Sequence, residues 1–237
     1  MTTLYVSPHL DDVAFSCAAS ILKRRDRVIV ATVFTEGKGS ATRRAEDRRA
    51  FTDTVHLGFL DAPERLRIRP SFTSLVLEPR VDRLLVQRIR RALQPLVKQA
   101  DRVFFPLGIG GHIDHRTVFE AHPPGAYFYE DRPYALAAPL RLLRLLELRG
   151  GRCKRAVFDR DFEPLARFFA PGERPACVAE LSRRLAMPHP RRFWLRSSLH
   201  RFEARPARAL IETYRSQRPD VWDPSLERHF RESTLQR

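Results

Sequence analysis

One run of β-branched and apolar residues limits the possible folds of this chain more than any other feature. Residues Arg27 to Phe34 read RVIVATVF, and Gly37 and Gly39 break the pattern soon afterwards. A strand with one face in water alternates apolar and polar residues, whereas a strand covered on both faces is apolar almost throughout. The run therefore predicts an inner strand of a parallel sheet with helices on both faces.

Strand and helix patterns alternate around this run. The N-terminal part predicts a strand at Thr3 to Val6 and helices at Val13 to Arg24 and Ala41 to His56. After the second helix, Leu57 to Asp61 is expected to be a short strand or loop. Further patterns predict helices at Val81 to Gln99, Leu140 to Leu148 and Arg208 to Ser216, and strands at Arg102 to Phe105 and Ala126 to Tyr129. Such a series gives an α/β fold, here a Rossmann-like three-layer αβα arrangement with a mostly parallel sheet.

The chain is long enough for one domain with a sizeable core, because it has 237 residues and no low-complexity linker. We expect a single domain, residues 1–237, with a site-bearing core in 1–135 and a C-terminal part in 136–237. In the C-terminal part, Ala156 to Phe158 is β-prone, and Met187 to Arg201 is rich in Pro and Arg. The tail from Gln217 carries Pro219 and Pro224, which predicts partial mobility.

The net charge of +15 raises the question of a polyanionic partner. Only Lys23, Lys38, Lys98 and Lys154 are lysines, and the arginines are spread along the whole chain. Because dispersed charge of this kind is typical of a solvated surface, we do not expect a nucleic-acid partner. An anionic substrate or membrane surface would also suit this charge.

Cysteine usage and the N-terminus bear on the compartment. Cys17, Cys153 and Cys177 lie far apart and form no C-x-x-C pair, so neither a disulfide framework nor a cysteine zinc site is expected. The first residues lack the basic start of a signal peptide, and no run of eighteen apolar residues occurs. We expect a soluble cytoplasmic protein.

Two polar clusters directly follow predicted strands. The first offers His9, Asp11 and Asp12, and the second offers His112, Asp114 and His115. In an open α/β sheet, the loops after the strands line one crevice. A catalytic zinc ion takes three protein ligands and a water molecule, so two histidines and one aspartate would suffice. The remaining carboxylate and imidazole would serve proton transfer and oxyanion stabilisation, which indicates a metal-dependent amidohydrolase.

The first cluster alone has a simpler interpretation, in which an aspartate caps the helix that begins at Val13. The occurrence of both clusters after two separate strands favours the metal site.

The motifs resemble those of the PIG-L or LmbE-like family of zinc-dependent N-acetylglucosaminyl deacetylases. Residues 7–12 read SPHLDD, similar to the family's PHxDD motif, and residues 112–115 read HIDH, similar to its HxDH motif. Residues 43–46 (RRAE), 57–61 (LGFLD) and 214–217 (YRSQ) are similar to its R-x-x-E, LGxxD and C-terminal Ser-Gln segments. The resemblance covers most of the first 131 residues.

This resemblance implies roles for particular residues. Zinc would be bound by His9, Asp12 and His115, with Asp11 as general base and His112 stabilising the oxyanion. Substrate contacts are expected from Arg43 and Asp61, with Asp114 and Glu130 as further candidates and Asp131 as an alternative to Glu130 at the same strand end. Arg43 and Asp61 could equally be a solvated helix charge and a turn residue. Val13 stands where many members have Glu, a departure that should leave the ligands unchanged.

Three functions remain open. The first is a zinc-dependent hydrolase that removes an N-acetyl group from an N-acetylglucosamine-type or related N-acylated small molecule. The second is a zinc amidase that cleaves a larger acyl group, which would use the same residues. The third is a basic polyanion-binding or nucleic-acid-binding protein with a vestigial site, which the presence of all five site residues disfavours.

Overall fold

The structure is a computed structural model, and it describes residues 1–68, 71–77, 81–201, 204–217 and 229–236. The strands are β1 (Thr2–Ser7), β2 (Arg27–Glu36), β3 (Thr54–Leu60), β4 (Arg102–Pro106), β5 (Tyr127–Tyr129), β6 (Trp194–Arg201) and β7 (His229–Gln236). The α-helices are α1 (Asp12–Leu22), α2 (Ser40–Ala50), α3 (Ala62–Arg65), α4 (Arg83–Gln99), α5 (Ile113–Glu120), α6 (Ala138–Arg149), α7 (Glu173–Ala186) and α8 (Ala204–Ile211). Shorter helical turns are η1 (Thr73–Leu77), η2 (Tyr134–Leu136), η3 (Asp159–Phe168) and η4 (Arg215–Gln217).

The strands form one sheet in the order β3-β2-β1-β4-β5-β7-β6. The five strands from β3 to β5 are parallel, and β7 pairs antiparallel with both β5 and β6. This arrangement confirms the predicted α/β fold with a mostly parallel sheet. The chain runs outward in both directions from the boundary between β1 and β4, and in sheets of this kind ligands bind at such a switch point.

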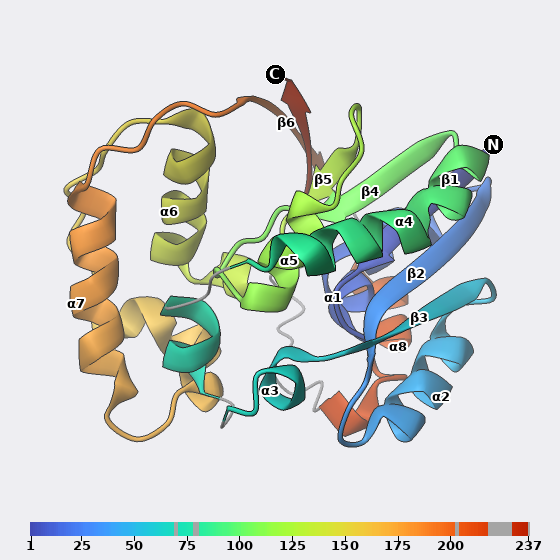
Figure 1. Ribbon diagram of the computed structural model, residues 1–237, viewed down its shortest axis with the longest axis horizontal. Helices are drawn as coiled ribbons and strands as arrows, with labels where there is room; N and C mark the ends of the chain where they lie inside the picture. The colour runs from blue at the N-terminus through green and yellow to red at the C-terminus, as the bar shows by residue number, and fades with distance from the viewer. Residues whose placement is uncertain (69–70, 78–80, 202–203, 218–228, 237) are drawn as a thin grey trace.

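Helices cover both faces of the parallel part of the sheet, as Figure 1 shows with α4 and α5 in front and α1 and α8 behind. Successive residues of β1 point to opposite faces, since Leu4 and Val6 belong to one apolar cluster and Tyr5 to another. The first cluster includes Ile89 of α4, and the second includes Cys17 of α1. The inner residues of β2 are buried almost without interruption, as the run RVIVATVF predicts.

Several predicted boundaries are wrong. The helix expected to reach His56 ends at Ala50, because Phe51 is extended and the β-branched Thr54 and Val55 pair with β2 to form β3. The β-prone patch Ala156 to Phe158 is not a strand. The stretch rich in Pro and Arg contains β6, which pairs with β7. The expectation of a mobile tail falls partly on residues 218–228, outside the described residues, whereas β7 follows them.

A partly buried ion cluster joins three helices beside the sheet. Glu147 of α6 accepts from Arg116 of α5, from Arg144 of its own helix at 3.1 Å and from Arg184 of α7 at 2.9 Å. Arg144 also donates through Nε to the carbonyl of Leu107 at 2.7 Å. The cluster therefore anchors α6 and α7, on the left in Figure 1, to the loop that follows β4.

None of the helices in the described part of the chain is long and apolar enough to cross a lipid bilayer.

Candidate active site

The two motif loops lie at the switch point, because one follows β1 and the other follows β4. The first loop is shaped by the Ser7 hydroxyl, which donates to the carbonyl of His9 at 2.5 Å and accepts from the amide of Val13 at 3.2 Å. Asp11 occupies the N-cap position of α1 without making a capping hydrogen bond. Helix capping therefore does not account for the aspartates of this cluster.

The three predicted metal ligands lie close together. Oδ2 of Asp12 lies 3.1 Å from Nδ1 of His9 and 3.3 Å from Nε2 of His115. Ligands bound tetrahedrally to zinc at about 2.0 Å lie about 3.3 Å from each other, so this spacing suits a small cation. Nε2 of His115 is also buried and forms no hydrogen bond with any residue that the structure describes, as expected of a nitrogen that binds a metal.

Each of the two histidines has a carboxylate at its other ring nitrogen. Nε2 of His9 lies 3.1 Å from Oδ2 of Asp114, and Nδ1 of His115 lies 2.7 Å from Oδ1 of Asp131. An imidazole N–H that donates to a carboxylate leaves the opposite nitrogen with its lone pair, and metal-bound histidines commonly have this partner. Both lone pairs then face Asp12.

Electrostatics agree with a site for a cation. Burial alone would lower the pKa of His9, but Asp114 and Asp12 outweigh it and raise that pKa to about 9. Burial opposes protonation of His115 as well, yet Asp12 and Asp131 raise its pKa to about 10. The carboxylates that stabilise a proton on these rings would also stabilise a metal ion between them. The residues present therefore fit a bound metal.

A second group of possible ligands combines His9 with His112 and Asp114. Asp114 is fully buried, and both of its oxygens are already engaged. Oδ1 accepts from Arg65 at 2.6 Å, and Oδ2 accepts from the amide of Ala62 at 2.8 Å in addition to facing His9. The group around Asp12 and His115 is therefore the better candidate, and Asp114 supports His9.

His112 is buried next to His9 and His115. Its Nδ1 accepts from the amide of Asp114 at 3.2 Å and so caps α5. Burial lowers the pKa of His112 to about 3, so the ring is neutral near pH 7 and carries its proton on Nε2. It can therefore donate one hydrogen bond.

Asp11 is the neighbour of Asp12 and is slightly more exposed, with 15% of its side chain accessible against 7% for Asp12. Its Oδ1 is 3.5 Å from Nη2 of Arg43, and its Oδ2 is 3.2 Å from the side-chain amide nitrogen of Gln217. Burial raises the pKa of Asp11, while Arg43 acts to lower it. A carboxylate with a raised pKa is suited to accept a proton.

The remaining candidates lie in different surroundings. Asp61 is at the N-cap position of α3, and its Oδ1 is buried without a hydrogen-bond partner among the described residues. Glu130 pairs with Arg141 of α6 at 2.9 Å. Its neighbour Asp131 contacts His115 instead, whereas the sequence interpretation had left a substrate contact open between these two acids.

Tyr134 is a site neighbour that the sequence interpretation missed. Its ring packs edge-on against His115, with 5.3 Å between centroids, and lies 6.2 Å from the ring of His112. No motif marks it, because η2 follows β5 in a stretch without periodicity.

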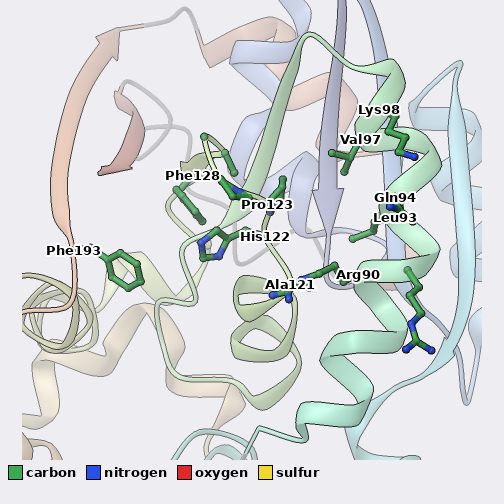
Figure 2. Close-up of a pocket in the computed structure, with 14 residues that line it drawn as sticks. Arg90, Leu93, Gln94, Val97, Lys98, Ala121, His122, Pro123, Phe128 and Phe193 are labelled. Carbon is green, nitrogen blue, oxygen red and sulfur yellow. The ribbon is translucent and has the colours of Figure 1, made fainter. Parts of the chain in front are cut away.

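A pocket of about 760 Å³ lies away from these residues, between α4 and the segment that leads into β5 (Figure 2). It is at the opposite ends of the strands, since Lys98 and Ala126 come just before β4 and β5. Three of its fourteen lining residues are basic, namely Arg90, Arg91 and Lys98. Arg and Lys together make up 43 of the 237 residues of the chain, so the pocket is not notably enriched in cations. It includes none of the predicted site residues.

Fold and site define a class of protein, a Rossmann-like α/β protein with a candidate metal site of two histidines and one aspartate at the switch point. The family model described as "PIG-L: GlcNAc-PI de-N-acetylase" matches residues 4–123, just over half of the chain. The chain belongs to this family.

Known proteins are similar to it over different spans. A 2'-N-acetylparomamine deacetylase from Streptomyces fradiae is 32% identical over 167 residues, with 56% of this chain and 57% of the relative covered. The chain thus spans little more than half of that relative. A crystal structure titled as a deacetylase-teicoplanin complex has a TM-score of 0.61 at 17% identity and covers 100% of both chains. The zinc inhibited form of teicoplanin deacetylase Orf2 has a TM-score of 0.57 at 16% identity and covers 99% and 98%. These two structures share the fold.

Proposed function

We propose that this protein is a zinc-dependent hydrolase that removes the N-acetyl group from an amino sugar in a small-molecule substrate. One observation carries the proposal: His9, Asp12 and His115 converge at the switch point, each histidine backed by a carboxylate. Two imidazoles and one carboxylate with an open fourth position are typical ligands of catalytic zinc.

In this proposal, zinc bound by these three residues would supply Lewis-acid activation of water and of the amide carbonyl. Asp11 accepts the proton of the attacking water and delivers it to the leaving nitrogen, so that acetate and a free amine are formed. The Nε2–H of neutral His112 donates to the oxyanion of the tetrahedral intermediate.

The substrate class follows from chemistry at the mouth of the site and from the relatives. The relative from Streptomyces fradiae is named for 2'-N-acetylparomamine, and the structural neighbours are named for teicoplanin. The buried, partnerless Oδ1 of Asp61 supports a hydrogen bond from a sugar hydroxyl, and Arg43 lies beside Asp11 where it could contact the substrate. Asp114 and Glu130 hold other protein groups, so we assign them supporting roles.

The test measures metal content and acetate release on the same samples. We expect about one zinc per chain in the wild type and little in Asp12→Ala, with loss of acetate release from N-acetylglucosaminyl compounds. Asp53→Ala is the matched control, because Asp53 pairs with Arg27 on the exposed surface. Release of a longer acyl group but not of acetate would favour the larger-acyl amidase. A wild type that takes up no metal and binds a polyanion in a salt-dependent manner would refute the proposal.

A further inference from the structure

We infer that Gln217 is a positioning residue, whose side-chain amide joins Asp11 to Arg43 and holds the Asp11 carboxylate in the orientation needed for proton transfer. The inference rests on the proposed function and assigns to it a residue about two hundred positions from Asp11 in the sequence.

The orientation of the Gln217 amide follows from its neighbours. One of its terminal atoms lies 2.7 Å from Nε of Arg43, and the other lies 3.2 Å from Oδ2 of Asp11. A guanidinium group only donates hydrogen bonds, so the atom facing Arg43 is the oxygen. The amide nitrogen then donates to Asp11.

The segment that carries Gln217 is fixed to α2 by buried acids. The amide of Ser216 donates to Glu46 at 2.8 Å, and its hydroxyl lies 2.5 Å from the other Glu46 oxygen and 2.9 Å from the Gln217 oxygen, so its single proton can serve either acceptor. Tyr214 donates to Asp47 at 2.7 Å through a hydroxyl group that is buried. Since Glu46 and Asp47 are both almost fully buried, this end of the chain is held firmly against α2.

Two motifs that look independent in the sequence thus contact each other. Arg43 and Glu46 lie three positions apart on α2 and share a face of that helix. Arg43 holds Gln217, and Glu46 holds Ser216. The R-x-x-E helix and the Ser-Gln segment therefore form one clamp.

The clamp ends on Asp11. Arg43 approaches one oxygen of this carboxylate and Gln217 the other, so rotation of the group is restricted from both sides. A displacement of about 1 Å in a reacting group can cost about a hundredfold in rate. Loss of Gln217 should therefore lower kcat far more than it changes KM.

The experiment compares three variants of the full chain loaded with zinc, assayed by acetate release. Gln217→Leu removes both contacts, whereas Gln217→Glu keeps an oxygen for Arg43 and replaces the donor to Asp11 with a second carboxylate. Arg215→Leu, on the exposed side of the same turn, is the control. We expect kcat to fall about 10-fold to 100-fold in both Gln217 variants, with KM changed less than about threefold, metal content retained and the control like the wild type.

Two results would overturn the inference. Gln217→Leu with kcat within about threefold of the wild type would show that the contact does not matter for the reaction. A Gln217→Glu variant as active as the wild type, beside an impaired Gln217→Leu, would show that the residue only anchors the segment through Arg43.

A second readout needs no activity and separates this inference from the proposed function. Thermal unfolding of Asp11→Ala, Gln217→Leu and the double variant should be non-additive, because the two side chains share one contact. A wild type without deacetylase activity would refute the proposed function, and the unfolding cycle would still decide whether the contact exists. Additive effects on Tm would refute the contact itself.

Discussion

The carboxylates behind His9 and His115 set which ring nitrogen of each histidine is free. Within the described part of the chain, Oδ2 of Asp131 accepts from the amide of Ile109 at 2.9 Å, and its Oδ1 faces His115. Both neighbours donate, so an asparagine there would keep one acceptor and turn its N–H₂ group toward a donor on the other side.

We therefore predict that Asp131→Asn weakens zinc binding about 10-fold to 100-fold, as measured by competition with a chromophoric chelator. Glu130→Gln is the neighbouring control, since Glu130 pairs with Arg141 and does not contact a ligand. Equal losses in both variants, or none in Asp131→Asn, would contradict the assigned role of Asp131.

Residue roles were predictable from the sequence only where a motif carried them. Both polar clusters follow predicted strands, which was enough to expect them in one crevice. The family resemblance singled out His9, Asp12 and His115, and the structure brings these three together. Asp131 lies past the end of a three-residue strand, so strand alternation could not distinguish it from Glu130. The contact between Gln217 and Asp11 depends on how the C-terminal segment packs, which no local pattern reveals.

At the scale of elements, the loop between β4 and α5 requires a glycine at position 110. Gly110 has a φ of 88°, and a Cβ added there would lie 2.5 Å from Cγ of Tyr134. Gly125 has a similar φ of 79° but has nothing within 4 Å of such a Cβ. The two glycines therefore separate backbone strain from steric overlap.

We predict that Gly125→Ala costs about 1 kcal/mol of unfolding free energy from the left-handed backbone alone. Gly110→Ala should cost about 3 kcal/mol, because overpacking against Tyr134 adds about 2 kcal/mol. It should also reduce metal uptake, since Tyr134 packs against His115. Chemical denaturation of both variants measures the difference, and equal costs would show that Tyr134 moves aside freely.

The order of strands and helices was largely predictable, because β1, β2, α4 and β4 have clear apolar periods. Predicted element boundaries were wrong where charged residues obscure the apolar periodicity. The Arg-rich helical pattern that begins at Ala41 has no clear end between Ala50 and His56. Residues 54–60 form a strand because they pair with β2. The pairing of β6 with β7 joins segments nearly thirty residues apart, which a local pattern does not encode.

At the scale of the whole molecule, the stability of a chain with a net charge of +15 depends on where its acidic residues lie. Burial alone would raise the pKa of Glu147, but Arg116, Arg144 and Arg184 outweigh it and lower that pKa to about 2. A depressed pKa stabilises the fold above the unfolded value near 4.5, and this stabilisation disappears as the pH falls toward 2.

Glu147→Gln should therefore lower the unfolding free energy by about 3 kcal/mol at pH 7. The difference from the wild type should stay constant down to about pH 5 and shrink toward zero near pH 2, as followed by urea denaturation across this range. Glu180→Gln is the control, because Glu180 pairs with its helix neighbour Arg183 on an exposed surface, and we expect little change. A pH-independent difference would contradict the electrostatic origin.

The distance along the chain between the proposed zinc ligands and Gln217 bears on biosynthesis. His115 completes the set of proposed zinc ligands, and Gln217 follows it by 102 residues (217 minus 115). Ribosomes add about 5 to 20 residues per second, so a nascent polypeptide would present its metal ligands roughly 5 to 20 s before Gln217 is made. The growing chain could thus bind its ion first and gain hydrolytic activity only after Gln217 has been added.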